Sequence, residues 1–391
     1  MDRIILHIDV NNAFLSWTAI DLLRHGYSID IRTIPSVIGG DRKSRKGIVL
    51  AKSIPAKKYG INTPEPIYFA LKKCPNLKVY PPNYKWYQYM SNKLFTYLKT
   101  FTDEIEIFSI DECFLDYTSI KHIYGDEKEF AQMISNYIKT NLKFTVNIGI
   151  ANNKLCAKMA SDFSKPDKIH TLYNYEVKTK MWPLKVDDLL WIGKKTSEKL
   201  HQLKIDTIGD LASADVYFLT KYFKNNAVRM IESANGIDES KVDNLERIEK
   251  GISNEITVID DLIDKKDIYD ALSSVVDRTS LRLRKQNRYA SCVAIILKDK
   301  NFKRITHQKK LKNPTNNTEE IKKIVKELLN EMGDLQPIRL VGVRLDNLTD
   351  NLYRQFSMFD DQKEIEKNDK LQKVLDDIKE KYGQDLKIKK D

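Results

Sequence analysis

The sequence predicts an α+β protein with several domains, and three observations lead to this class. The chain has 391 residues, more than one ordinary hydrophobic core holds, so two to four domains are expected. Up to about residue 170, stretches of strand-like alternation and of helical periodicity follow one another. The next part is helical with short turns, and helices and strands mix again from Ile252 onward.

The first part begins with a strand over residues 4–9, because Ile4, Leu6 and Ile8 share one face of an extended chain. Further strands are expected at residues 48–50, 104–108, 113–117 and 144–150, and helices at 11–23, 55–60, 84–100, 126–142 and 153–163. A basic loop bounded by glycines, residues 39–47, precedes the second strand. This order indicates a ferredoxin-like sheet with an insertion after its first strand.

The rest of the chain divides where its composition changes. Residues 171–238 are predicted to be helical, and the polar, charged residues 239–250 are predicted to be a linker. Within residues 251–350 we expect helices at 268–285 and 319–332 and strands at 291–297, 302–306 and 338–345. Residues 351–391 form a tail with one expected helix, 370–382.

The net charge of +11 suits a polyanionic partner. Residues 351–391 contain as many basic as acidic residues, so the positive charge belongs to the first 350 residues. A lysine-rich soluble protein without such a partner accounts for the charge equally well.

Three features indicate a cytoplasmic protein without a membrane segment. No stretch of about 18 apolar residues occurs. The N-terminus leads straight into a strand without a signal peptide. The cysteines are far apart and form no CxxC pair, which favours reduced thiols and argues against a zinc site. They are Cys74, Cys113, Cys156 and Cys292.

Three carboxylates at strand ends carry the strongest chemical signal. Asp111 and Glu112 lie where one β-run stops, and Asp9 ends the first strand. Clustered carboxylates repel one another and are costly to desolvate, so cations are expected to neutralise them. Hard oxygen ligands suit Mg²⁺, which shares its shell with substrate phosphates. The pattern predicts a two-metal phosphoryl- or nucleotidyl-transfer site, although the Asp-Glu pair alone is also typical of a solvated turn.

Lysines follow the acids in the sequence and form a second candidate group. Lys154 and Lys158 are four residues apart and share a helix face, and Lys165 lies where that helix breaks before Pro166. Such side chains can pair with phosphates. The alternative is an ordinary solvated lysine face.

Two Ile-Gly turns flank a short helix in the predicted helical region. Ile192-Gly193-Lys194 and Ile208-Gly209 have the form of a helix-hairpin-helix unit. Its exposed backbone N–H groups can hold a phosphate without reading sequence. The alternative is an ordinary turn between two helices.

The tail contains the segment Gln355-Phe356-Ser357-Met358-Phe359-Asp360, with three apolar side chains among polar neighbours. Exposed apolar residues suggest a short motif that docks into a partner. The alternative is a strand that packs back on its own domain.

Together these residues resemble Y-family DNA polymerases, specifically the bacterial DNA polymerase IV (DinB/UmuC-like) translesion group, over nearly the whole chain. Residues 109–112, Ser-Ile-Asp-Glu, resemble the family's palm signature, and residues 149–166 resemble its Gly-Ile-Ser-x-Asn-Lys…Lys-Pro run. The resemblance implies a multidomain right-hand polymerase with a ferredoxin-like palm. The implied parts are a palm (1–11 and 83–170), fingers (12–82), a helix-hairpin-helix thumb (171–238), the linker (239–250), an α/β little finger that binds DNA (251–350) and the tail (351–391).

The resemblance also implies site residues. Asp9, Asp111, Glu112 and the carbonyl of Val10 would bind two Mg²⁺ ions, with Mn²⁺ as an alternative. The residues implied for the incoming nucleotide are Phe14 as a steric gate against a ribose 2′-OH, Lys57 in the fingers and Lys165 at the triphosphate. The residues implied for DNA are Lys154, Lys158, Ile192, Gly193, Lys194 and Gly209, and those for a sliding clamp are Gln355, Met358 and Phe359.

Two segments depart from the family pattern. The usual Tyr-x-Ala-Arg of the fingers is replaced by Ile54-Pro55-Ala56-Lys57, and lysine cannot make arginine's bidentate phosphate contact. The usual Asp-x-Asp-x-Phe-Phe is replaced by Asp9-Val10-Asn11-Asn12-Ala13-Phe14, so a looser packing around the base pair is expected. Neither change removes an implied metal ligand.

The expected function is DNA-directed DNA synthesis of low processivity and fidelity, adding dNTPs to primer-template DNA in translesion synthesis and repair. The chain is expected to act as a monomer tethered by a sliding clamp. A nucleotide cyclase is the first alternative, since the same sheet and metals serve that chemistry, but the helix-hairpin-helix argues against it. A non-catalytic DNA- and clamp-binding protein is the second, and the intact acids argue against it.

Overall fold

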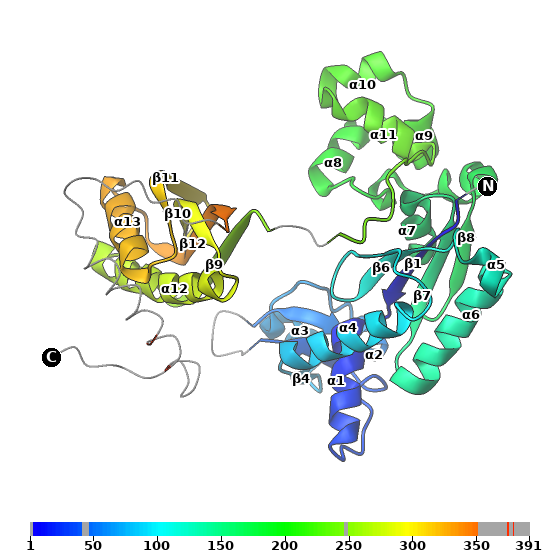
Figure 1. The fold of residues 1–391 in the computed structure, drawn as a ribbon, viewed down its shortest axis with the longest axis horizontal. Helices are drawn as coiled ribbons and strands as arrows, with labels where there is room; N and C mark the ends of the chain where they lie inside the picture. The colour runs from blue at the N-terminus through cyan, green and yellow to red at the C-terminus, as the bar shows by residue number, and fades with distance from the viewer. Residues whose placement is uncertain (1–2, 41–46, 246–248, 351–373, 375–377, 379–391) are drawn as a thin grey trace. The chain divides into compact units, whose positions relative to one another are not determined.

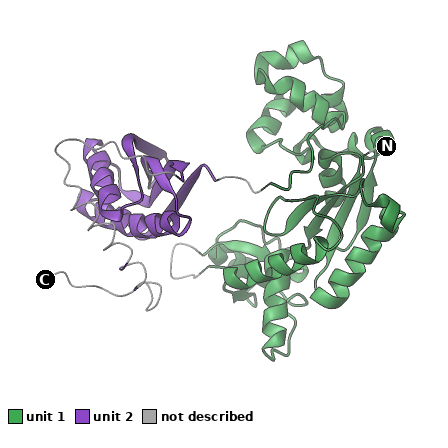
Figure 2. Ribbon diagram, in the orientation of Figure 1, with its two compact units in different colours: residues 1–42, 47–246 green, residues 43–46, 247–391 purple. Residues whose placement is uncertain are grey.

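The computed structural model describes residues 3–40, 47–245 and 249–350, together with residues 374 and 378. The chain forms two compact units, residues 1–42 with 47–246 and residues 43–46 with 247–391 (Figure 2). Most of the basic loop and the tail helix, and the whole of the motif Gln355, Met358 and Phe359, lie outside the described residues. Within the described part of the chain, no helix is long and apolar enough to cross a membrane.

A five-stranded sheet, in the order β5-β6-β1-β7-β8, forms the centre of the first unit (Figure 1). Its strands are β1 (Ile5–Val10), β5 (Ile105–Ile107), β6 (Glu112–Asp116), β7 (Val146–Ala151) and β8 (Ile169–Leu172). The central strand β1 pairs antiparallel with both β6 and β7. This places the ends of strands far apart in sequence beside one another.

Helices cover both faces of this sheet. The β1 residues Leu6 and Ile8 are fully buried in a core with residues of α4 (Tyr84–Leu98) and α6 (Glu127–Tyr137). On the other face Ile5 shares a core with Ala157 of α7 (Lys154–Asp162). Helix α7 approaches β7 so closely that a Cβ on Gly149 would lie 1.9 Å from the Ala157 carbonyl oxygen. Glycine in this buried strand is therefore a packing requirement.

The inserted segment forms a smaller α/β body beside the central sheet. Its three-stranded sheet has the order β3-β2-β4, and Val37 and Val49 lie in its buried core. The elements are α1 (Ala13–Arg24), β2 (Ser36–Gly39), β3 (Val49–Lys52), α2 (Ile54–Lys57), α3 (Ile67–Lys73) and β4 (Lys78–Tyr80). The short strands β2 and β4 are not among the sequence-based expectations, because runs of three or four residues show little periodicity.

A helical bundle follows β8 and completes the first unit. Its four α-helices are α8 (Lys194–Gln202), α9 (Ile208–Ala212), α10 (Val216–Phe223) and α11 (Asn226–Ala234). Short helices occur at Lys121–Tyr124 (α5), Ile138–Leu142, Asn174–Glu176, Val177–Met181 and Val186–Asp188. The fully buried Leu200, Ile208 and Leu219 hold the bundle together.

The second unit is a four-stranded antiparallel sheet, in the order β11-β10-β12-β9, with two helices. Alternate residues Val293, Ile295 and Leu297 of β10 are buried in a core that residues of both helices share. The elements are β9 (Gly251–Leu262), α12 (Lys265–Lys285), β10 (Tyr289–Asp299), β11 (Arg304–Thr315), α13 (Thr318–Glu331) and β12 (Ile338–Thr349). Strand β9 escapes sequence-based prediction because polar residues interrupt its apolar ones.

Candidate active site

The register of the central sheet brings the three predicted acids together. Asp9 of β1 is paired directly with Glu112, the first residue of β6. The Val10 N–H donates a hydrogen bond to the carbonyl oxygen of Asp111 (3.0 Å). The carboxylates thus belong to adjacent antiparallel strand ends, although more than 100 residues separate them in the sequence.

Glu112 is held ionised by basic neighbours. The Lys158 Nζ lies 2.6 Å from its Oε2, and the buried His7 Nε2 lies 3.3 Å from the same oxygen without hydrogen-bond alignment. Burial alone would raise the pKa of Glu112, but His7 and Lys158 outweigh it and lower that pKa to about 2. Burial lowers the pKa of His7, which favours the neutral imidazole at pH 7. Its Nδ1 lies 2.8 Å from Ser161 Oγ.

Asp111 differs from Glu112 because no lysine neutralises it among the described residues. Burial and the negative charges of Asp9 and Glu112 raise its pKa, although the Ser109 hydroxyl donates a hydrogen bond to its Oδ1 (2.6 Å). The acidic cluster is therefore incompletely compensated by protein charge. A divalent cation would supply what is missing.

The donor set fits Mg²⁺. The three carboxylates provide hard oxygen ligands at strand ends, the type this ion prefers. In the described part of the chain, no three His, Cys, Asp or Glu side chains are already arranged around one metal position. Instead, one carboxylate oxygen of Asp9 contacts Lys165, and one of Glu112 contacts Lys158. Metal binding would therefore replace these lysine contacts by metal contacts. The fit rests on the donor chemistry and on the charge of Asp111.

Lys165 reaches back to the acids, as its place at the end of the helix predicts. Its Nζ lies 2.5 Å from Asp9 Oδ2 and 2.7 Å from Asp162 Oδ1. Burial opposes its charge, but Asp9 and Asp162 raise the pKa of Lys165.

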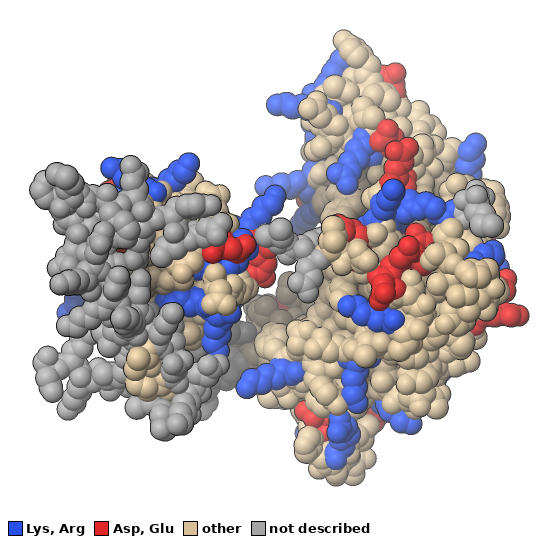
Figure 3. Space-filling view, in the orientation of Figure 1, with Lys and Arg blue, Asp and Glu red and all other residues tan. Residues whose placement is uncertain are grey.

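On the visible face of the first unit, acidic and basic side chains are interspersed and do not form patches of one sign (Figure 3).

Two buried amides position the loop that carries Lys165, and sequence reasoning missed this role for both. The Asn11 Nδ2 donates to Asn147 Oδ1 (3.0 Å), and Asn11 Oδ1 accepts the N–H of Asp167 (2.8 Å). The Asn147 Nδ2 donates to the carbonyl oxygens of Ser161 (2.9 Å) and Ser164 (2.6 Å). Asn11 and Ala13 are both buried, so the departure from the family pattern does not leave Asn11 unsatisfied.

The two lysines of α7 have different partners. Lys158 contacts Glu112, whereas Lys154 Nζ lies 2.5 Å from Oε2 of the buried Glu106 on β5. Lys154 also donates to the Lys241 carbonyl oxygen (3.3 Å). The helix face that the two lysines share thus spans two separate ion pairs, and only Lys158 belongs to the acid cluster.

Phe14 lies at the start of α1, and its ring is held in place. The ring stacks on the buried Tyr87, with centroids 4.6 Å apart and planes at 9°, and Tyr84 meets it edge-on at 6.1 Å. The Tyr87 hydroxyl is 2.7 Å from Thr18 Oγ1. A rigid aromatic ring near the end of β1 is suited to a steric role. The backing residue Tyr87 has no signal in the sequence beyond its helix position.

The insertion contributes two neighbouring cations. Lys57 is exposed, and burial together with the charge of Lys57 lowers the pKa of Lys52. Lys52, which sequence reasoning missed, accepts a hydrogen bond from Asn12 at its carbonyl oxygen (2.7 Å). Ile54, which replaces the family's tyrosine, is 59% exposed at the start of α2. The Lys52 ammonium donates to the Ile61 carbonyl oxygen (2.6 Å), so the insertion itself holds it, and the exposed Lys57 is the candidate for a phosphate contact.

The two Ile-Gly turns of the helical bundle differ in structure. At the start of α8, Gly193 has no side-chain cap and a Cβ there would meet nothing within 4 Å. At the start of α9, Thr207 and Asp210 form a capping box, and a Cβ on Gly209 would lie 3.2 Å from Trp182 Cβ. The first turn is therefore open to a ligand, and the second is closed by its own side chains and by packing.

Known proteins resemble both parts of the chain. Residues 8–162 match the impB/mucB/samB family, and residues 249–358 match its C-terminal domain. A DNA polymerase IV of Clostridium acetobutylicum is 47% identical over 99% of this chain and 97% of its own length. A DNA polymerase IV 1 of Bacillus subtilis is 34% identical over 98% of this chain and 92% of its own.

A solved structure of a chimeric Y-family DNA polymerase has the same fold. It matches with a TM-score of 0.78 and 24% identity, over 89% of this chain and 100% of that chain. The fold class predicted from the sequence, mixed helix and sheet in several domains, is thereby confirmed.

Proposed function

This chain belongs to the impB/mucB/samB family of Y-family DNA polymerases, and we propose that it extends a DNA primer opposite damaged template bases by two-metal catalysis. The observation that carries the proposal is the pairing of Asp9 with Glu112 next to the under-neutralised Asp111. Three carboxylates on two neighbouring strand ends form a ligand set for divalent cations that bind triphosphate.

The side chains around the acids have distinct tasks in this proposal. Asp9, Asp111, Glu112 and the Val10 carbonyl would hold two Mg²⁺ ions, which lower the pKa of the attacking hydroxyl and stabilise the leaving pyrophosphate when bound. Lys165 neutralises the triphosphate from the Asp9 side, and Lys158 keeps Glu112 ionised. Phe14 excludes a 2′-OH by steric contact. Positioning and electrostatics supply the rate enhancement, without covalent chemistry from the protein.

Backbone N–H groups and cationic side chains outside the central sheet would bind the nucleic acid. The open turn at Ile192 and Gly193, with the exposed Lys194 beside it, presents N–H groups to a phosphate. Lys57 extends the positive surface toward the triphosphate. The basic second unit would follow the duplex backbone, so DNA affinity should fall steeply with salt.

A sliding clamp is the proposed second partner, on the sequence of Gln355, Met358 and Phe359 alone. These residues lie outside the part of the chain that the structure describes. Tethering would raise the local concentration of an enzyme with low processivity at the primer end.

Primer extension with Asp111→Asn tests the proposed function. Loss of this ligand should reduce the extension rate at least about 10³-fold on intact and abasic templates, while DNA binding measured by fluorescence anisotropy is retained. Asp103→Asn, an exposed acid near β5, is the matched control and should extend like wild type. Equal extension by wild type and Asp111→Asn would contradict the proposal.

Two further measurements separate the alternatives. Conversion of a nucleoside triphosphate to a cyclic product in the absence of DNA would identify a cyclase. Wild-type protein that binds primer-template DNA without extending it would identify a non-catalytic DNA-binding protein, and Ile54 and Lys57 would then mark where activity was lost.

A further inference from the structure

Trp191 has two features that packing within the protein does not explain. Its side chain is 66% exposed, and its backbone has a φ of +74°. This left-handed conformation is disfavoured for residues with a Cβ and is usually taken by glycine. A large apolar side chain in such a place indicates a contact with something other than the protein core.

The ring of Trp191 lies next to the strand that carries the acids. It meets the Phe108 ring edge-on, with centroids 6.2 Å apart. The Phe108 N–H donates to the carbonyl oxygen of Glu112 (3.0 Å). Trp191 also immediately precedes the open turn at Ile192 and Gly193. The ring therefore contacts a residue that is hydrogen-bonded to the backbone of Glu112, and Trp191 itself adjoins the proposed phosphate-binding turn in the chain.

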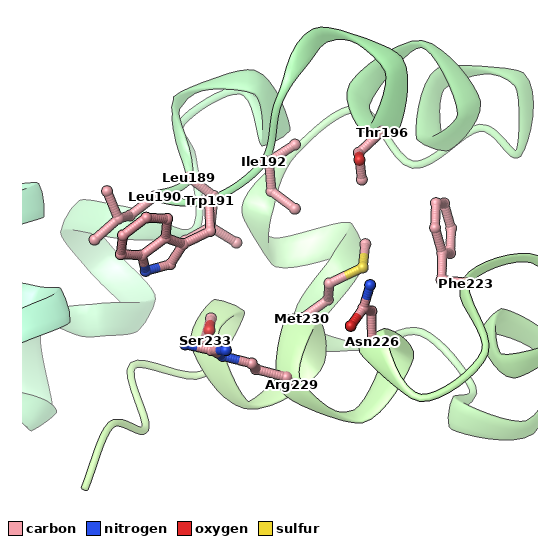
Figure 4. A pocket seen from close by; sticks show the side chains of 10 residues that line it. All are labelled: Leu189, Leu190, Trp191, Ile192, Thr196, Phe223, Asn226, Arg229, Met230 and Ser233. Carbon is pink, nitrogen blue, oxygen red and sulfur yellow. The ribbon is translucent and has the colours of Figure 1, made fainter. Parts of the chain in front are cut away.

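A cavity opens beside this ring within the helical bundle. It has a volume of about 410 Å³, and its lining includes Trp191 and Ile192 on one side and Arg229 and Met230 of α11 on the other (Figure 4). Arg229 is exposed, and its guanidinium has no ion pair or hydrogen bond within the described residues. An aromatic ring opposite an unpaired guanidinium is a combination suited to a sugar-phosphate strand.

We infer that Trp191 contacts the primer strand just behind its 3′ end, and that the cavity between Trp191 and Arg229 accepts the sugar-phosphate of that strand. The inference rests on the proposed function. A primer whose 3′-OH is at the acids and whose phosphates reach the turn at Gly193 would run close to this ring, which contacts Phe108 on one side and adjoins the turn on the other. Arg229 supplies the charge for the phosphate, and the indole supplies the apolar surface for the sugar or base.

Three variants test this contact. Trp191→Gly removes the ring and suits the left-handed backbone, so it should leave the thermal stability unchanged or higher. Trp191→Phe keeps a ring and should retain most of the contact. Tyr217→Ala, which removes a 75% exposed ring from α10 of the same bundle, is the matched control. Steady-state extension would give kcat and the KM for primer-template DNA for each protein.

A second, direct readout uses tryptophan fluorescence. Of the four tryptophans, Trp17 is fully buried and Trp86 and Trp182 are partly buried. The difference in acrylamide quenching between wild type and Trp191→Phe therefore reports on Trp191. Primer-template DNA should reduce that difference, whereas a ring that only joins two parts of the protein would be quenched equally with and without DNA.

In Trp191→Gly, the KM for primer-template DNA should be about 10-fold higher and the kcat within about threefold of wild type. Trp191→Phe should have a near-normal KM. Primer-template DNA should protect Trp191 from acrylamide quenching. An unchanged KM in Trp191→Gly, or equal quenching with and without DNA, would overturn the inference while extension by wild type leaves the proposed function standing. If wild type fails to extend any primer, the proposed function falls and the quenching measurement alone decides the inference.

Discussion

The acid site of the central sheet and the first turn of the helical bundle differ in how their charges are satisfied. In the sheet, Glu112 is paired with Lys158 and Asp9 with Lys165. At the turn, the start of α8 is uncapped and Arg229 has no partner among the described residues. In the proposed function, the acid site would therefore exchange its lysine contacts for substrate, whereas the turn and Arg229 would need no such exchange before they bind DNA. Substitutions in the first region should have large kinetic effects, and substitutions in the second region should have small effects on affinity.

Replacing Lys165 by methionine should have the largest kinetic effect at the acid site. Loss of a charge-assisted contact to the triphosphate should raise the KM for dNTP about 100-fold. The control Lys154→Met removes the lysine that pairs with the buried Glu106, whose Oε2 also accepts the Asp243 N–H, so it should lower the free energy of unfolding by about 3 kcal/mol with a near-normal KM. Single-nucleotide incorporation and urea denaturation measure the two effects. A reversal of these two outcomes would show that the wrong lysine has been assigned to the nucleotide.

Replacing Phe14 by alanine should have a smaller effect, on the choice between dNTP and rNTP. Without the ring that Tyr87 holds, the preference for dNTP over rNTP should fall about 30-fold. Competition between the two nucleotides in primer extension gives this ratio directly. Tyr89→Ala, on the same helix as Tyr87 but without contact to Phe14 in the structure, should keep the wild-type ratio, and loss of selectivity in both variants would argue for a general loosening.

The two glycine turns should give the smallest effects, and of opposite kinds. Gly193→Ala places a methyl group in open space, so stability should change by less than about 1 kcal/mol, while a hindered phosphate contact weakens DNA binding about fivefold. Gly209→Ala forces a contact with Trp182, so it should cost about 1 kcal/mol of stability with a smaller change in affinity. Urea denaturation and anisotropy with labelled primer-template DNA test both. Equal affinities for wild type and Gly193→Ala would remove this turn from the DNA-binding surface.

The sequence was sufficient for the acids because their signal is local. The alternation of Ile4, Leu6 and Ile8 predicts a strand that ends at Asp9. Antiparallel pairing of the neighbouring strands then brings Asp9 beside Glu112. Lys165 was predictable for the same reason, since a helix that stops before proline returns its end to the sheet. Strand β9 and the short strands β2 and β4 of the insertion were not, because polar or brief segments carry little periodicity.

Partners that form across the sheet could not be predicted from spacing. Helical periodicity makes Lys154 and Lys158 equivalent. Which acid each one pairs with, Glu106 or Glu112, depends on the strand that the lysine faces in the folded protein. Asn147 and Tyr87 similarly acquire their roles from residues far away in the chain. Gly149 did carry a usable signal, because a glycine inside an apolar strand indicates a close approach of another backbone.

The amide pair Asn11 and Asn147 has a consequence for how the protein should respond to acid. Amides do not titrate, so the hydrogen bonds from this pair to the loop of Lys165 are the same at every pH at which the chain is folded. Burial and its acidic neighbours raise the pKa of Asp111, whereas His7 and Lys158 lower that of Glu112, so without bound metal Asp111 takes up a proton before Glu112 as the pH falls. Mild acid would then change the charge at Asp111 while the amide framework beneath Lys165 keeps its hydrogen bonds.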